Sequence, residues 1–92
     1  LNQKKLKMRR LEGVLRARSY VLVDYDVPMN DLHLATAITP GIESPTVSPL
    51  QNPDWVAVRA MVPRKDVNRV MDELYAVGAR AILVSSLLAC RL

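Results

Sequence analysis

The chain has 92 residues, of which half are apolar, 13 are Lys or Arg and 9 are Asp or Glu. This length predicts one small domain with a modest core, and the absence of Phe predicts that the core is aliphatic. The single cysteine, Cys90, excludes an internal disulfide framework and is typical of a reducing compartment. No apolar run approaches the length of a membrane-spanning helix and no signal peptide is present, so we expect a cytoplasmic protein.

The net charge of +4 is concentrated near the N-terminus. Residues 1–18 carry seven Lys or Arg side chains and only Glu12 against them, a net charge of +6. The other 74 residues carry six cations and eight carboxylates, a net charge of −2. We therefore divide the chain into a basic linker helix over 1–18 and a folded domain over 19–92. Because the chain begins inside this helix, at Leu1 and not at Met, we expect it to be a fragment of a longer protein.

The N-terminal helix is expected over Leu1–Leu15, with an apolar stripe that includes Met8 and Leu11. Three interpretations are open: a linker helix that packs on a neighbour, a nucleic-acid-binding arm, and a membrane-surface helix. The net negative charge of the remaining chain disfavours a nucleic-acid-binding arm. The absence of Trp or Phe on the apolar stripe disfavours a membrane-surface helix. We therefore favour the linker and predict binding neither to nucleic acid nor to membranes.

A strand and a short helix are predicted at the start of the folded domain. The strand covers Ser19–Asp26, and its two-residue period places the valines and Tyr25 on one face and Asp24 and Asp26 on the other. The helix covers Asn30–Ile38, with Asn30 or a neighbour as its cap.

The segment Thr36–Leu50 is predicted to form a rigid, shaped loop. Pro40 ends the preceding helix, Gly41 allows a backbone path that a side chain would forbid, and Pro45 and Pro49 stiffen the exit. Rigid loops between regular elements are common sites of small-ligand recognition, although a simple proline-rich turn explains the same composition. Residues 45–50 also have the composition of a short strand.

The second half adds a central strand over Trp55–Val62, a helix over Lys65–Val77 that Gly78 caps, and a last strand over Ala81–Ser85. The order is therefore βαββαβ. It predicts an α+β, ferredoxin-like fold with an antiparallel sheet and two helices on one face of it. The basic helix precedes this fold in the sequence. The tail Leu87–Leu92 carries exposed leucines, which favours a contact with another subunit.

No arrangement of residues in the sequence predicts a catalytic or metal site. Asp24 and Asp26 share a strand face, but no third group converges on them, so Asp24 is interpreted as an exposed acidic strand end. His33 has neither a second histidine nor a cysteine nearby, which favours a partly exposed structural role over metal binding.

Three segments carry a resemblance to a known family: PGIESPT at 40–46, WVAVRAMVP at 55–63 and GARAILVSS at 78–86. They resemble the C-terminal regulatory domain of long-form ATP phosphoribosyltransferase, the first enzyme of histidine biosynthesis, and most closely its actinobacterial branch. The resemblance covers residues 19–92 and implies a regulatory domain. The catalytic domains, which use Mg²⁺ to condense ATP with phosphoribosyl pyrophosphate, would lie outside this chain. The resemblance thus implies a non-catalytic chain that needs no cofactor of its own.

The resemblance also implies a ligand site. In the family, L-histidine binds between adjacent regulatory domains, which make trimer-type contacts within a hexamer, and it inhibits the enzyme allosterically. Asp26 matches a polar residue that faces the histidine, and Thr46 matches a hydroxyl residue of the same pocket. Ala81 matches a small residue that leaves room for the ligand, and Ile42 matches an apolar wall residue that is usually leucine. The change from Leu to Ile keeps the volume but alters the shape, which affects affinity more than ligand identity.

Two other functions fit the predicted strand order less well. A trimeric signalling module of the nitrogen-regulatory type, which senses nucleotides or metabolites, normally has a long mobile loop and basic phosphate-binding residues in the folded body. Neither feature is evident in this sequence. RNA binding on the open sheet face usually needs aromatic residues at mid-strand positions, and Trp55 lies at a strand start. We therefore expect a histidine-sensing regulatory domain.

Overall fold

The structure is a computed structural model that describes residues 3–90, apart from the side chain of Arg16. Leu1, expected in the first helix, and Leu92, expected in the tail, lie outside the described residues. The helices and strands are α1 (Gln3–Ser19), β1 (Tyr20–Pro28), α2 (Leu32–Ile38), β2 (Thr46–Pro49), β3 (Trp55–Pro63), α3 (Val67–Ala76) and β4 (Arg80–Ser86).

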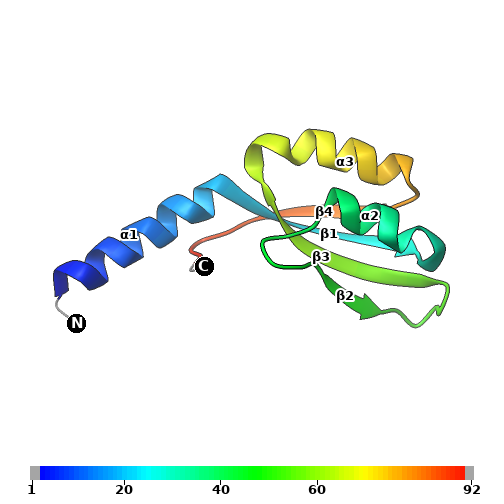
Figure 1. The fold of residues 1–92 in the computed structure, drawn as a ribbon, viewed down its shortest axis with the longest axis horizontal. Coiled ribbons are helices and arrows are strands. Elements are labelled where there is room, and N and C mark those ends of the chain that lie inside the picture. Colours follow the sequence, from blue (N-terminus) through cyan, green and yellow to red (C-terminus); the bar gives the residue numbers. More distant parts are fainter. Residues whose placement is uncertain (1–2, 91–92) are drawn as a thin grey trace.

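The four strands form one antiparallel sheet in the order β2-β3-β1-β4. Helices α2 and α3 cover one face of this sheet, the other face carries no helix, and α1 extends away from the body (Figure 1). This arrangement confirms the predicted ferredoxin-like α+β fold with a preceding helix. Within residues 3–90, no helix is long and apolar enough to cross a membrane.

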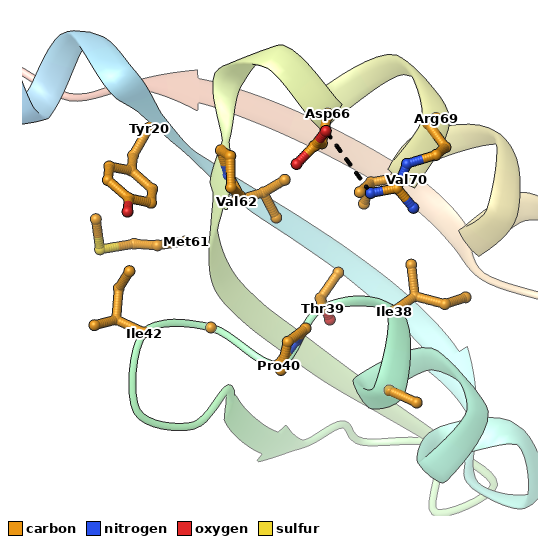
Figure 2. A pocket seen from close by; sticks show the side chains of 13 residues that line it. Tyr20, Ile38, Thr39, Pro40, Ile42, Met61, Val62, Asp66, Arg69 and Val70 are labelled. Carbon is orange, nitrogen blue, oxygen red and sulfur yellow. Dashed lines mark ion pairs between the residues drawn. The ribbon is translucent and has the colours of Figure 1, made fainter.

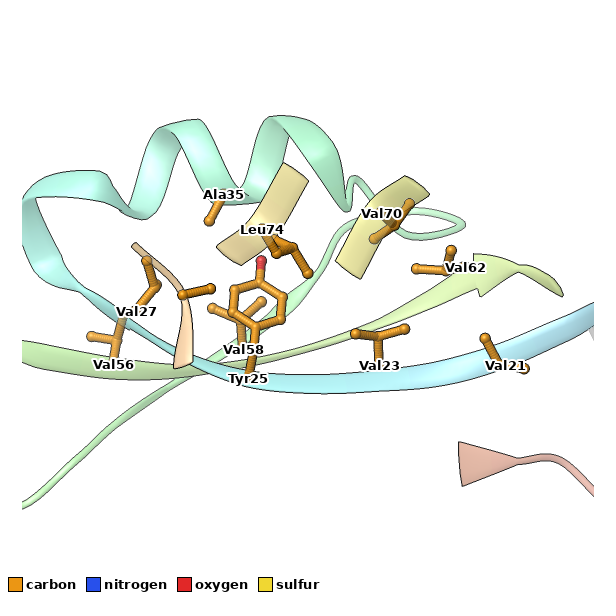
Figure 3. Close-up of a cluster of buried hydrophobic side chains, with 11 residues drawn as sticks. Val21, Val23, Tyr25, Val27, Ala35, Val56, Val58, Val62, Val70 and Leu74 are labelled. Carbon is orange, nitrogen blue, oxygen red and sulfur yellow. The ribbon is translucent and has the colours of Figure 1, made fainter. Parts of the chain in front are cut away.

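The core lies between the sheet and the two helices that cover it. Every second residue of β1 and of β3 is buried, as the alternation in the sequence predicts. These side chains point toward α2 and α3, and Val70 and Leu74 of α3 meet them (Figure 3). The buried residues of the two strands are Val21, Val23, Tyr25 and Val27 in β1 and Val56, Val58, Ala60 and Val62 in β3.

One hydrogen-bonded pair is buried in this aliphatic core. Tyr25 Oη and Thr39 Oγ1 lie 2.7 Å apart, and the two residues are 1% and 0% exposed. Thr39 Oγ1 donates its proton to the carbonyl oxygen of Ala35 over 3.3 Å, so it accepts the proton of Tyr25. Burial raises the pKa of the Tyr25 phenol, and the hydrogen bond to Thr39 offsets part of this rise. The pair joins the middle of β1 to the end of α2.

The two covering helices begin later than the sequence predicts. Their expected starts are Asn30 and Lys65, but a 3-10 turn precedes each helix, and the α-helical residues begin at Leu32 and Val67. Each turn follows a strand-ending proline and is closed by a backbone hydrogen bond. The N-cap residue of α2 is Asp31, the neighbour of Asn30, but its side chain makes no cap hydrogen bond, and none forms at the start of α3 either.

Helix α1 contacts the body through its C-terminal half. Arg64 Nε donates to the Arg18 carbonyl oxygen over 2.8 Å, and the Cys90 amide donates to the Gly13 carbonyl oxygen over 3.1 Å. A Cβ atom at Gly13 would lie 3.0 Å from the Cys90 carbonyl oxygen, so Cys90 packs directly on the helix. The predicted apolar stripe is largely exposed, with Met8, Leu11 and Leu15 all more than half accessible.

Removal of either hydroxyl from the Tyr25–Thr39 pair is expected to destabilise the domain, but to different extents. Tyr25→Phe leaves Thr39 with its acceptor at Ala35 and should lower the free energy of unfolding by about 1 kcal/mol. Thr39→Val leaves the buried phenol without a partner and should lower it by about 1–3 kcal/mol. Urea unfolding followed by circular dichroism measures both losses. A Thr39→Val variant as stable as Tyr25→Phe would contradict the assigned direction of the bond.

The raised pKa of Tyr25 predicts a loss of stability in alkali. Below a pH of about 10, the ordinary pKa of tyrosine, the phenol is protonated in both the folded and the unfolded state. Above it the unfolded state ionises first, so the free energy of unfolding falls as the pH rises toward the folded pKa. Thermal unfolding across this range should show a steeper decline for the native chain than for Tyr25→Phe. Parallel declines would exclude Tyr25 as the source.

Candidate ligand-binding site

The open face of the sheet carries a depression of about 340 Å³, a volume at the lower end of those that bind small molecules. All four strands contribute to it. Its polar and small lining residues are Asp24 and Asp26 from β1, Thr46 and Ser48 from β2, Ala57 and Arg59 from β3, and Ala81 from β4.

The strand register explains why residues so distant in sequence meet here. Arg59 is paired with Asp24 of β1 on one side and with Thr46 of β2 on the other. Two residues along the strands, Ala57 of β3 is paired with Asp26 and with Ser48. Because residues two apart lie on one face, both rows of side chains point to the open side.

An ion pair crosses the middle of the depression. Arg59 Nε donates to Asp24 Oδ1 over 2.7 Å, with the two side chains 60% and 30% exposed. This hydrogen bond, together with the charge of the carboxylate, raises the pKa of Arg59 further above its ordinary value. Asp24 is therefore the partner of a permanently charged guanidinium, and the interpretation of this residue as a simple exposed strand end is wrong.

Asp26 contributes a second carboxylate, which is half-buried. No hydrogen bond or ion pair to it is formed by any other residue among 3–90. Its neighbour across the ladder, Arg80, is turned away, because Nη1 of Arg80 donates to the carbonyl oxygens of Ala79 and Tyr75 over 2.7 and 3.2 Å. The Arg80 guanidinium also stacks 4.0 Å from the centroid of the Tyr75 ring. The charge of Asp26 is thus uncompensated within the described chain.

Ala81 lies at an irregularity in the last strand. The pairing of β4 with β1 shifts register between Asp24 and Asp26, and Ala81 has a φ of 54°. This left-handed conformation is unusual for a residue with a Cβ atom. The bulge turns Ala81 into the lining of the depression, where its methyl group occupies little space.

The fourth residue expected at the site, Ile42, lies elsewhere. It lines a different cavity of about 480 Å³ between the loop after α2, the end of β3 and the start of α3. Figure 2 shows Ile42 in this cavity beside Met61 and Tyr20, with the ion pair of Asp66 and Arg69 on another side. One chain therefore brings together Asp26, Thr46 and Ala81 but leaves Ile42 apart.

Comparison with known proteins identifies the family. The family model described as "HisG, C-terminal domain" matches residues 17–89. The chain belongs to the HisG C-terminal domain family. It is 66% identical over 85 residues to a protein of Pseudarthrobacter chlorophenolicus, 62% identical over 85 residues to one of Streptomyces coelicolor, and 58% identical over 82 residues to one of Mycobacterium tuberculosis.

Each of these relatives is named ATP phosphoribosyltransferase. The matches cover 89–92% of this chain but only 29–30% of the relatives, so the chain spans under a third of their length. The resemblance seen in the PGIESPT, WVAVRAMVP and GARAILVSS segments is thereby confirmed at the level of the family.

No residue pattern in the sequence indicated a role for Arg59 of this HisG C-terminal domain. The signal was present in part, because Arg59 interrupts the outward face of an otherwise apolar strand, WVAVRAMVP. Its partner Asp24 lies 35 residues away and is found only through the strand register. Elsewhere, His33 is exposed on α2, and among residues 3–90 no three His, Cys, Asp or Glu side chains converge as a metal site.

The left-handed conformation of Ala81 predicts that glycine is tolerated better there. Removing the Cβ atom relieves a cost of about 1–2 kcal/mol, and the extra freedom of unfolded glycine cancels about 0.5–1 kcal/mol of the gain. Ala81→Gly should therefore raise the free energy of unfolding by about 0.5–1 kcal/mol in a urea titration.

Ala57 provides the matched control, since it lines the same depression from the regular strand β3. Ala57→Gly should lower the free energy of unfolding by about 0.5–1 kcal/mol. At an extended position glycine relieves no backbone strain, and only its entropic cost remains. If both variants are destabilised equally, Ala81 does not hold a left-handed backbone in solution.

Proposed function

We propose that this chain is the regulatory domain of an ATP phosphoribosyltransferase and that it binds L-histidine as a feedback inhibitor of histidine biosynthesis. One observation carries the proposal. Asp26, Thr46 and Ala81, matched to the histidine-binding positions of the family by sequence alone, come from three different strands yet line one depression. The name of the relatives, ATP phosphoribosyltransferase, supports the parent enzyme in this proposal.

The chemistry of the depression suits a cationic group. The carboxylate of Asp26 is half-buried and unpaired among the described residues, so an ammonium or imidazolium gains a charge-assisted hydrogen bond there without displacing another partner. The Thr46 hydroxyl is exposed on the edge strand β2 and can donate or accept at the same ligand. The methyl group of Ala81 leaves space for the rest of the molecule.

The position of Ile42 supports a site shared between subunits. Ile42 is 44% exposed and lines a different cavity from the other three residues, so a ligand that touches all four needs Ile42 from a neighbouring copy. Apolar side chains that a neighbour can cover lie on β4 and the tail, where Leu83 is 64% and Leu88 is 95% exposed. We infer trimer-type contacts between these domains within a hexameric parent.

In this proposal the domain regulates catalysis but does not perform it. Substrates and Mg²⁺ belong to the rest of the parent enzyme, and α1 connects that part to the sensing domain. Inhibition is then allosteric, and a coupling free energy of about 1–3 kcal/mol between the two sites suffices for effective feedback.

Calorimetric titration of L-histidine tests the assignment. We expect Asp26→Asn to weaken binding more than tenfold, because it removes the charge that faces the ligand. Thr46→Ala should weaken it by about three- to tenfold through the loss of one hydrogen bond. Ala81→Asn should also weaken it, since asparagine fills the space left by alanine but accepts a left-handed backbone.

Asp72→Asn is the matched control, because Asp72 is an exposed carboxylate on α3, away from the depression. It should bind L-histidine with native affinity. The titration is made on an oligomeric preparation, either this chain or the parent enzyme, with the mass determined by light scattering. A folded oligomer that does not bind L-histidine at millimolar concentration refutes the proposed function.

A further inference from the structure

We propose that Arg59 binds the α-carboxylate of the ligand and that Asp24 is the positioning residue that holds Arg59 ready for it. This inference rests on the proposed function and assigns to the site its second charged contact. It makes the depression a receptor for a zwitterion, that is, for an α-amino acid and not for an amine.

The position of Arg59 is the first argument. It lies at the middle of β3, an interior strand, and points to the open face between Asp24 of β1 and Thr46 of β2. Asp26 is its diagonal neighbour on β1, at a Cα separation of about 7–8 Å in an antiparallel ladder. A ligand the size of one amino acid therefore reaches the carboxylate and the guanidinium together.

The bonding capacity of the guanidinium is the second argument. Arginine has five N–H donors, and Arg59 uses only the one on Nε, in its bond to Asp24. Both terminal nitrogens are without a partner among residues 3–90. They present two parallel N–H groups, the geometry that binds a carboxylate through two hydrogen bonds.

The third argument is a comparison with other arginines of the body. The Arg80 guanidinium is held by two carbonyl oxygens and an aromatic ring. Arg69 forms ion pairs with Asp66 and Glu73. Arg64 donates a hydrogen bond to the end of α1. Arg59 is the arginine that lines the depression, and its bond to Asp24 is made on the side of Nε. The bond to Asp24 thus fixes the direction of the Arg59 side chain and does not use the two terminal nitrogens that would bind a carboxylate.

The charges in the depression complete the argument. Asp24 balances Arg59, and Asp26 remains as a net negative charge. Asp26 alone would accept any small amine, whereas Asp26 together with Arg59 selects a ligand with an ammonium and a carboxylate on one carbon. An amine without the carboxylate would leave the terminal nitrogens of Arg59 without their partner.

The test compares L-histidine with histamine, which keeps the imidazole and the ammonium group but lacks the carboxylate. Both are titrated into the native oligomer and into Arg59→Gln. We expect the native protein to prefer L-histidine by more than tenfold. Arg59→Gln should lose affinity for L-histidine by about 10–100-fold, because the deleted contact exists only with the carboxylate. Its affinity for histamine should not fall, because the variant leaves Asp24 as a second uncompensated carboxylate in the depression.

Two further variants complete the comparison. Asp24→Asn should weaken L-histidine binding by about three- to tenfold, because Arg59 keeps its own charge but loses the bond that positions it. Arg10→Gln removes an exposed arginine of α1 that lines neither cavity, and it should change neither affinity. Thermal unfolding of each variant shows whether the domain remains folded.

A second measurement does not depend on histamine. The carboxylate resonance of bound L-histidine, labelled with ¹³C at that carbon, should shift between the native protein and Arg59→Gln, while the imidazole resonances stay in place. Equal losses for both ligands, no loss for L-histidine, or an unmoved carboxylate resonance would overturn the role of Arg59 and leave the proposed function intact. Failure of the native oligomer to bind L-histidine would overturn both.

Discussion

The two-residue period of β1 is the constraint on which the rest of the structure depends. β1 is paired along its length with β3 and also with β4, and its alternate side chains fill the core. A slip of one residue would bring Asp24 and Asp26 into an aliphatic interior, where an unpaired carboxylate costs several kcal/mol (about 3–5 when its partner is missing). The packing of the core therefore also holds the two carboxylates of the depression on the open face.

The hydrogen bond between Tyr25 and Thr39 extends this order to the loop. It is made by the residue between the two aspartates, on the opposite face of β1, and it fixes the end of α2. The chain then leaves through Pro40 and Gly41, whose φ of 73° suits glycine, and reaches the sheet edge with Thr46 opposite Arg59. One buried polar contact thus helps to determine which part of the loop reaches the site.

The predictions from sequence succeed where periodicity controls the structure. The element order and the inward faces of β1 and β3 follow from alternation, since apolar side chains must share one face. The partner of Arg59 and the bulge at Ala81 depend instead on how strands far apart in sequence align, which a local pattern does not encode. The 3-10 turns were not predicted, because each is closed by a backbone hydrogen bond after a strand-ending proline, without a side-chain cap.

The last strand and the residues after it link the depression to helix α1. β4 contributes Ala81 to the site, and the chain that follows it reaches Cys90, whose amide is bound to Gly13 of α1. Arg64, directly after β3, holds the same helix at Arg18. These contacts alone do not couple ligand binding to the position of α1. A ligand moves α1 only if it binds two arrangements of β4 with different affinities. The register shift beside Ala81 is where β4 departs from regular pairing, and it lies within the depression, so a ligand there contacts the irregular part of the strand directly.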